Sequence, residues 1–262
     1  MTASLADRTF VIIGGTSGLG YSAAQAFIAA GARVVAVGRN PEKVELAGRE
    51  LGDAALVLPG DAQSPDTADR AIREALITFG GFHGLYHVAG GSGRELGDGP
   101  LHEMTDSGWE ATLRLNLTSL MYSNRAAVRQ FQKQKTGGSI LNMSSVLGFS
   151  PSPRHFATHG YAAAKAAVIG LTQSLASYYA SHNIRFNVIA PALVETPMSL
   201  RAAGNDAIMK FIKTKQPLDG GRIGQASDLD AAAVYFMSDA SRFTTGQVLS
   251  VDGGWTLSDG QY

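Results

Sequence analysis

One stretch near the start of the chain, residues 9–30, restricts the possible folds more than any other. Its residues 10–13 are all apolar, which indicates a strand buried on both faces of a parallel sheet. A turn rich in glycine covers residues 14–20, and apolar residues then recur at helical spacing up to Gly31. Strand, glycine turn and helix in this order predict a phosphate-binding unit, because glycines allow close backbone approach and a helix N-terminus attracts anions.

The amino-acid composition argues against several other classes of protein. The chain has 262 residues, 45% of them hydrophobic, and a formal net charge of zero with no basic run, which argues against nucleic acid as a partner. No apolar stretch approaches the ~18 residues of a membrane span, and residues 1–7 contain no apolar export segment. The absence of cysteine excludes disulfides, thiolate metal sites and cysteine nucleophiles. We therefore expect a cytoplasmic protein without a membrane partner.

Apolar strands and amphipathic helices alternate along the chain. The expected strands cover residues 10–13, 33–37, 55–58, 84–89, 139–143, 184–189 and 247–251. One expected helix follows the glycine turn, and the others cover residues 41–51, 64–79, 106–134, 158–181 and 227–237. Residues 194–221 are expected to be irregular or in short helices. This alternation predicts an α/β fold in which residues 1–262 form one domain, a doubly wound (Rossmann) parallel sheet of about seven strands flanked by helices.

Polar or small residues follow most of these strands. They are the glycine turn, Gly38-Arg39, Asp61, Ala89-Gly90, Ser144-Ser145 and residues 191–196. Because ligands bind beyond the carboxyl ends of the strands in sheets of this kind, we expect these residues to line one crevice.

The expected helix after the fifth strand carries Tyr161 and Lys165 four residues apart, which places the phenol and the ammonium on one helix face. The pKa of a free tyrosine is about 10, and a neighbouring ammonium lowers it by favouring the phenolate. The pair is therefore a candidate for proton transfer. The alternative is that Tyr161 is a core aromatic residue and Lys165 a solvated one.

The combined motifs resemble the short-chain dehydrogenase/reductase family over essentially the whole chain. The resemblance rests on the glycine turn, Asp61, Ala89-Gly90, Asn116, Ser145, Tyr161 with Lys165, Thr245-Gly246-Gln247 and residues 251–254. It implies that Tyr161 is the general acid or base and that Ser145 holds the substrate oxygen. It also implies that Lys165 lowers the tyrosine pKa and binds the nicotinamide ribose, and that Asn116 anchors a water of the proton relay. Ser144 is expected to be structural.

The strand ends and the resemblance together predict the cofactor contacts. These are Gly14, Thr16, Ser17, Gly18, Leu19, Gly20, Arg39, Asp61, Ala62, Ala89, Gly90, Tyr161, Lys165, Pro191, Val194 and Thr196. Enzymes that select NAD place a carboxylate at the end of the second strand, where this chain has Gly38 followed by Arg39. A guanidinium there favours the 2′-phosphate of NADP(H). NAD(H) stays open as a cofactor, because Arg39 can instead stack on the adenine.

The histidines do not indicate a metal site, because none of the six follows a paired ligand spacing backed by acids. His87 stands where the family has an asparagine, and we expect it to be packed or hydrogen-bonded rather than catalytic. His155 and His159 lie in a long loop, residues 147–160. We expect both to be surface residues, and the alternative is that they contact the substrate.

The expected function is hydride transfer between NADP(H) and a small, neutral carbonyl compound or secondary alcohol. Residues 194–216 form the expected substrate lid, with Leu147, Phe149 and Phe156 opposite it, and such apolar walls favour neutral substrates over charged acids. Two alternatives stay open. One is a non-redox or specialised member of the fold, although the four-residue spacing of Tyr161 and Lys165 argues against enoyl reduction. The other is a non-enzymatic NAD(P)-sensing regulator.

Two helices suggest a homotetramer, or at least a dimer, because they carry more apolar residues than one sheet face can cover. These residues are Leu117, Leu120, Met121, Ala126, Val128 and Phe131 in one helix, and Ala166, Ala167, Ile169, Leu171 and Leu175 in the other.

Overall fold

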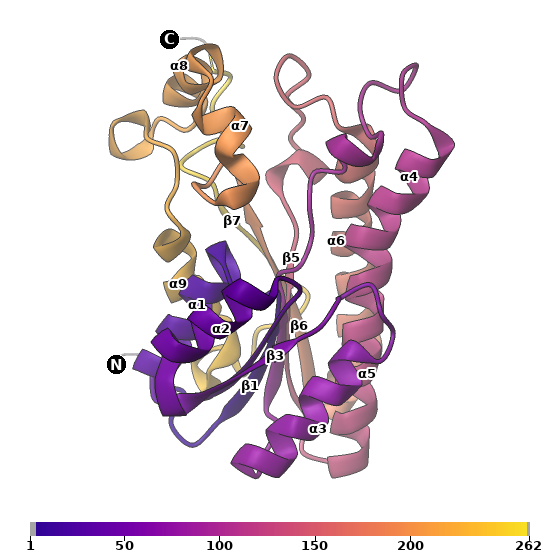
Figure 1. The fold of residues 1–262 in the computed structure, drawn as a ribbon, viewed down its shortest axis with the longest axis vertical. Helices are drawn as coiled ribbons and strands as arrows, with labels where there is room; N and C mark the ends of the chain where they lie inside the picture. The colour runs from indigo at the N-terminus through magenta and orange to yellow at the C-terminus, as the bar shows by residue number, and fades with distance from the viewer. Residues whose placement is uncertain (1–3, 261–262) are drawn as a thin grey trace.

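The computed structural model describes residues 4–260 and contains a seven-stranded sheet in the order β3-β2-β1-β4-β5-β6-β7 (Figure 1). All neighbouring strands in it are parallel. The strands are β1 (Thr9–Ile13), β2 (Arg33–Gly38), β3 (Ala55–Pro59), β4 (Gly84–His87), β5 (Gly138–Met143), β6 (Ile184–Pro191) and β7 (Val248–Val251). The predicted doubly wound parallel sheet is confirmed. The strand order reverses between β1 and β4, so the carboxyl ends of these two strands mark the switch point where ligands bind.

Helices cover both faces of the sheet. They are α1 (Gly18–Ala29), α2 (Pro41–Leu51), α3 (Thr67–Phe79), α4 (Asp106–Leu113), α5 (Ser119–Gln134), α6 (His159–Tyr179), α7 (Leu200–Ala203), α8 (Asp206–Lys215) and α9 (Asp230–Met237). Helices α1, α2 and α9 lie on one side of the sheet, and α3 to α6 lie on the other (Figure 1). No helix of the described residues is both long and apolar enough to cross a membrane.

Alternate residues of β1 supply the two halves of the core. Phe10 and Ile12 pack in the cluster that includes Phe27 of α1, whereas Val11 and Ile13 pack in the cluster that includes Phe131 of α5. All of these side chains are almost fully buried. A strand with both faces covered needs an unbroken apolar run, which is why the first strand could be predicted from its sequence.

Element boundaries differ from the sequence prediction where polar groups compete for the backbone. The third helix begins at Thr67 instead of residue 64, because the Thr67 hydroxyl donates to the Asp61 carbonyl over 2.6 Å and holds the intervening residues in a turn. The fourth strand ends at His87 instead of residue 89, since the N–H groups of both Val88 and Ala89 donate to the Ile13 carbonyl. The last predicted helix begins as a 3₁₀ turn over Ala226–Leu229 and continues as α9.

A pair of buried amides ties α5 to the middle of the sheet. Asn124 donates to Asn142 over 2.9 Å, and Asn142 donates back over 3.0 Å. Asn142 also donates to the Thr172 hydroxyl of α6, also over 3.0 Å. Both amides are almost completely buried, so a missing partner leaves the side-chain oxygen of the other amide without a donor in a region closed to water.

We expect Asn124→Leu and Asn142→Leu each to lower the free energy of unfolding by about 1–3 kcal/mol, because each leaves the buried amide oxygen of the other asparagine without a donor. The double variant should lose less than the sum of the two, since neither amide is then left alone. Urea unfolding measures all three values, with Gln130→Leu on the half-buried side of α5 as the control. Strict additivity of the two losses would show that the amides do not depend on each other.

Candidate active site

Ser145 lies two residues after the end of β5, at the start of a short 3₁₀ turn over Val146–Gly148. Its hydroxyl accepts from the Leu147 N–H over 3.2 Å and lies 3.5 Å from the Pro191 carbonyl at the end of β6. The hydroxyl therefore sits between the ends of two neighbouring strands. Ser144 has a different role, because its hydroxyl donates to the Lys165 carbonyl over 2.8 Å and fastens α6 to the sheet.

Tyr161 and Lys165 occupy the first two turns of α6 and face the ends of the strands. Tyr161 is 9% exposed and Lys165 is 3% exposed. The Lys165 ammonium lies 5.5 Å from the centre of the tyrosine ring and donates to the Met143 carbonyl over 3.0 Å. Both predicted side chains thus point into the protein at the carboxyl end of β5, and the alternative of a solvated lysine is wrong.

Burial controls the titration of both groups. It raises the pKa of Tyr161 to about 12, while a hydrogen bond with the Ser145 hydroxyl acts in the opposite direction. Burial also lowers the pKa of Lys165 to about 8, since the charged ammonium loses its hydration. At neutral pH the phenol therefore holds its proton, and the lysine still carries its charge.

Asn116 lies in a π-helical turn, Arg114–Thr118, that joins α4 to α5. The sequence predicts one continuous helix over residues 106–134, so this interruption is a correction. The Asn116 amide donates to the carbonyls of Gly91 and Thr112 over 2.9 and 3.0 Å, and its oxygen accepts from the Gly91 N–H over 3.0 Å. These bonds join the widened turn to the loop after β4. Such single π turns occur often at functional sites.

Gly90 shows how closely these groups converge. A Cβ atom at this position would lie 2.7 Å from the Asn116 amide oxygen and 3.4 Å from the Lys165 ammonium. The two side chains thus approach the same point of backbone from two helices, and a larger residue would separate them. Asn116, Lys165, Tyr161 and Ser145 therefore lie together beyond the carboxyl ends of the strands, and their catalytic roles stay a prediction.

Asp98, in the loop between β4 and α4, is a site residue that the sequence analysis missed. Its carboxylate accepts from the N–H groups of Gly160 and Tyr161 over 2.9 and 2.8 Å, and the residue is 6% exposed. The local cap residue Thr158 makes no side-chain bond to the helix. Asp98 therefore caps α6 from 62 residues away and sets the position of the tyrosine backbone.

The glycine turn has the form that a dinucleotide requires. Gly14 and Gly18 have φ angles of +90° and +53°, which favour glycine. Ser17 stands at the start of α1 but makes no side-chain cap, so the first N–H groups of the helix stay available for an anion. A Cβ atom at Gly18 would lie 3.4 Å from Thr196, and one at Gly14 would lie 2.7 Å from the Ala89 nitrogen. The fit supports a cofactor pyrophosphate at this turn.

Gly38 at the end of β2 is packed against Thr16 of the glycine turn. A Cβ atom on Gly38 would lie 1.9 Å from the Thr16 hydroxyl oxygen and 2.8 Å from its Cβ atom, so rotating the threonine cannot make room. Thr16 thus fills the space that a side chain at residue 38 would need. The adjacent Arg39 is exposed and has no ion-pair partner among the described residues.

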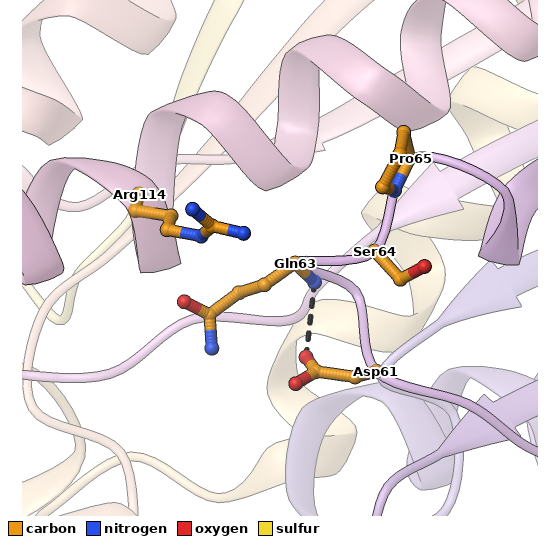
Figure 2. A pocket seen from close by; sticks show the side chains of 5 residues that line it. All are labelled: Asp61, Gln63, Ser64, Pro65 and Arg114. Carbon is orange, nitrogen blue, oxygen red and sulfur yellow. Dashed lines mark hydrogen bonds between the residues drawn. The ribbon is translucent and has the colours of Figure 1, made fainter.

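A hollow of about 440 Å³ lies beside Asp61, beyond the end of β3. Figure 2 shows its lining, with the guanidinium of Arg114 extending from the opposite helix toward Gln63. One oxygen of the Asp61 carboxylate accepts from the Gln63 N–H over 2.9 Å. The hollow is polar, and it lies at the end of the crevice where the predicted contacts Asp61 and Ala62 follow the strand.

The three histidines singled out in the sequence lie in different surroundings. His87 is buried and contacts the Ser123 hydroxyl over 2.6 Å and the Ala89 carbonyl over 3.1 Å, while burial and the charge of Lys165 lower its pKa to about 3. His159 is exposed, whereas the His155 ring packs 5.0 Å from the Phe211 ring of α8. Within residues 4–260 no group of three or more acidic, histidine or cysteine side chains is placed to hold a metal ion.

An apolar cluster joins the site to the two short helices. Val146, which follows Ser145, packs with Ala202 of α7 and Ile212 of α8. Leu147 and Phe156 lie against this cluster, as expected. Phe149 lies outside this cluster and is 46% exposed, so its place on the wall of the cleft stays a prediction.

Comparison with known proteins identifies the family. A family model described as enoyl-(acyl carrier protein) reductase matches residues 14–256. The chain is 36% identical over 259 residues to 3beta-hydroxysteroid dehydrogenase 2 of Eggerthella lenta, covering 96% of each protein. The chain belongs to the short-chain dehydrogenase/reductase family. The oxidoreductases of this family use NAD(H) or NADP(H).

Two further proteins are similar to this chain over nearly its full length. It is 31% identical to 2,5-dichloro-2,5-cyclohexadiene-1,4-diol dehydrogenase of Sphingobium indicum, covering 97% of this chain and 99% of the relative. A solved short-chain dehydrogenase/reductase from Mycobacterium ulcerans matches with a TM-score of 0.89 and 33% identity, covering 97% of this chain and 92% of the other.

We expect Asp98→Ala to lower the free energy of unfolding by about 1–3 kcal/mol, because the Gly160 and Tyr161 N–H groups lose their acceptor. Asp66→Ala is the matched control, since Asp66 precedes α3 but makes no side-chain cap. That control should stay within about 0.5 kcal/mol of the parent protein. Equal losses in urea unfolding for the two variants would contradict the assigned role of Asp98.

Proposed function

We propose that this family member transfers a hydride between NADP(H) and a carbonyl compound or secondary alcohol, with Tyr161 as the general acid or base. The observation that supports this proposal most strongly is the convergence of Ser145, Tyr161, Lys165 and Asn116 at the carboxyl ends of the strands. The nicotinamide, when bound, supplies or accepts the hydride.

In the direction of reduction, the Ser145 and Tyr161 hydroxyls hold the substrate oxygen, on which negative charge develops. Tyr161 then gives its proton to that oxygen. This role suits a buried phenol that is protonated at neutral pH. In the direction of oxidation Tyr161 must first lose its proton, which requires a positive charge nearby.

Lys165 supplies that charge and has spare donors. It meets only the Met143 carbonyl at hydrogen-bond distance among the described residues, which leaves two of its three N–H groups for cofactor hydroxyls or water. Asn116 sets the shape of this space through its bonds to Gly91 and Thr112. In our proposal the proton that leaves Tyr161 passes toward solvent along the side of the site that Lys165 and Asn116 line.

We infer a substrate with an apolar body. The names of two relatives specify alcohols borne on rings, a hydroxysteroid in one case and a cyclohexadiene diol in the other. Val146, Ala202 and Ile212 are buried inside the cluster, so the partly exposed Leu147 and Phe156 that pack on it would contact such a ring beside the catalytic hydroxyls. Residues 194–216 would act as the lid, because they include both short helices of this cluster.

The preference for NADP(H) is part of the proposal. Arg39 is exposed beside the glycine turn, and the position before it has no carboxylate to repel a 2′-phosphate. Thr16 adds a hydroxyl next to Gly38. The other predicted cofactor contacts, from the glycine turn to Thr196, are also part of the proposal.

We further propose that the protein is a homotetramer or dimer, although four of the apolar residues expected at its interface do not reach the surface. Leu120, Ala126, Val128 and Phe131 are buried within the single chain and offer nothing to a partner. The surface that supports the proposal comes from the other residues of these two helices, which include the exposed Ala166.

We expect Tyr161→Phe to lose carbonyl reduction by a factor of about 100 or more, because the acid that protonates the product oxygen is removed. Binding of NADPH should persist, since the ring still packs in place. Tyr178→Phe is the matched control, because Tyr178 lies on the same helix and is 71% exposed. Turnover of ring ketones, followed by NADPH absorbance, gives the result. Parent-like turnover of Tyr161→Phe would refute the mechanism.

For cofactor choice, the ratio of kcat/KM for NADPH to that for NADH should fall by roughly 10- to 100-fold in Arg39→Gln, the worth of one charge-assisted hydrogen bond. Arg49→Gln on α2 removes an exposed arginine away from the crevice and should leave the ratio unchanged. A Gly38→Asp variant is not a clean test, because its Cβ atom collides with Thr16. A parent protein that prefers NADH, or an unchanged ratio in Arg39→Gln, would show that Arg39 does not select the cofactor.

A further inference from the structure

Three segments around the substrate side of the site bring basic residues together. Arg94 belongs to the loop after β4, His155 to the loop before α6, and Arg201 to the short helix α7. The Arg94 guanidinium donates to the His155 carbonyl over 3.4 Å, which joins the first two segments. The His155 ring packs against Phe211 of α8, which joins them to the lid.

The charges in this group are not neutralised by carboxylates. Within the described part of the chain, neither Arg94 nor Arg201 forms an ion pair. Asp98 is the acidic group that acts on Arg94, but its two oxygens are engaged at the start of α6. Two guanidiniums on segments that pack together thus have no carboxylate partner within the described part of the chain.

Electrostatic effects on the side chains agree with this placement. Burial and then the Arg201 charge lower the pKa of Arg94, while Asp98 raises it. Burial and then the charges of Arg154 and Arg201 lower the pKa of His155. Arginine keeps its proton in spite of such shifts, so the repulsion between Arg94 and Arg201 persists at every physiological pH. An anion between them would relieve this repulsion.

The basic group borders the apolar cluster that we assign to the substrate. Ala202, next to Arg201, and Phe156, next to His155, both pack with Val146, the neighbour of the catalytic Ser145. Ala202 and Val146 are buried, whereas Phe156 is partly exposed, so a ligand whose body contacts Phe156 would extend toward the arginines with its far end. The lid lysine Lys215 does not join the group, because its ammonium donates to the Ser258 carbonyl and lies 5.7 Å from the Trp255 ring.

We propose that Arg94 and Arg201 form a subsite for an anionic group, a carboxylate or a group of similar charge, at the end of the substrate opposite the reacting carbon. Guanidiniums suit this role, because they bind carboxylates through paired, charge-assisted hydrogen bonds. The inference rests on the proposed function and refines it. It replaces the expectation of a neutral substrate with that of an apolar ring or chain that carries a negative charge.

A binding experiment with unreactive probes tests the subsite apart from the redox function. Cyclohexanecarboxylate and hexanoate are each compared with their neutral carboxamides by isothermal titration calorimetry, in the cofactor-free protein and again with NADP⁺. The variants are Arg94→Gln and Arg201→Gln. Arg73→Gln is the control, because this exposed arginine of α3 changes the net charge equally at a distance from the site.

We expect the protein to bind at least one carboxylate about 10-fold or more tightly than its carboxamide, as charge-assisted hydrogen bonds require, and the preference should weaken in high salt. Both Arg94→Gln and Arg201→Gln should lose most of the preference, and Arg73→Gln should keep it. Equal affinity for acid and amide, no binding of either acid, or a preference that survives in both variants would overturn the proposal. Because no probe reacts, missing dehydrogenase activity would be a separate result that counts against the proposed function alone.

Discussion

The burial of one ammonium group, that of Lys165, is the constraint on which the site depends. An ammonium without water or acceptors is expensive to bury, and here, within residues 4–260, one backbone carbonyl, that of Met143, accepts from it. The position of β5 relative to α6 is therefore fixed by the need to keep this contact. The same burial keeps the Tyr161 phenol protonated and lowers the pKa of the lysine, so one packing arrangement sets the chemistry of both groups.

The surrounding structure holds α6 at the distance that this contact needs. Asp98 fixes the first turn through two backbone N–H groups, and the Ser144 hydroxyl binds the Lys165 carbonyl one turn later. Gly148 allows the loop after β5 to approach the helix closely, since a Cβ atom there would lie 2.8 Å from the Ala166 nitrogen. Two separate segments, the loop that holds Asp98 and the loop after β5, thus position one helix. The geometry of catalysis in our proposal follows from these contacts rather than from the tyrosine and lysine alone.

The sequence predicted the parts of this arrangement that depend on neighbouring residues. An apolar run followed by glycines specifies a buried strand and a phosphate turn, and a four-residue spacing puts Tyr161 and Lys165 on one helix face. It did not predict contacts between distant segments. Nothing near Asp98 indicates that its carboxylate caps a helix 62 residues later, and nothing in β2 indicates that Thr16 fills the space above Gly38. The π turn at Asn116 was also missed, because its residues are ordinary helix formers and the turn arises from bonds to the loop at Gly91.

The claim that burial holds the proton on Tyr161 until the cofactor binds can be measured directly. Protein labelled with ¹³C at the tyrosine ζ carbon gives one NMR signal for each tyrosine, and Tyr161→Phe identifies the relevant one. In the cofactor-free protein we predict that this signal stays in its phenol form through neutral pH, with a pKa of about 12. Addition of NADP⁺ should lower that pKa, because a positive nicotinamide ring favours the phenolate. A Tyr161 phenol that already titrates near neutral pH without cofactor would contradict this account.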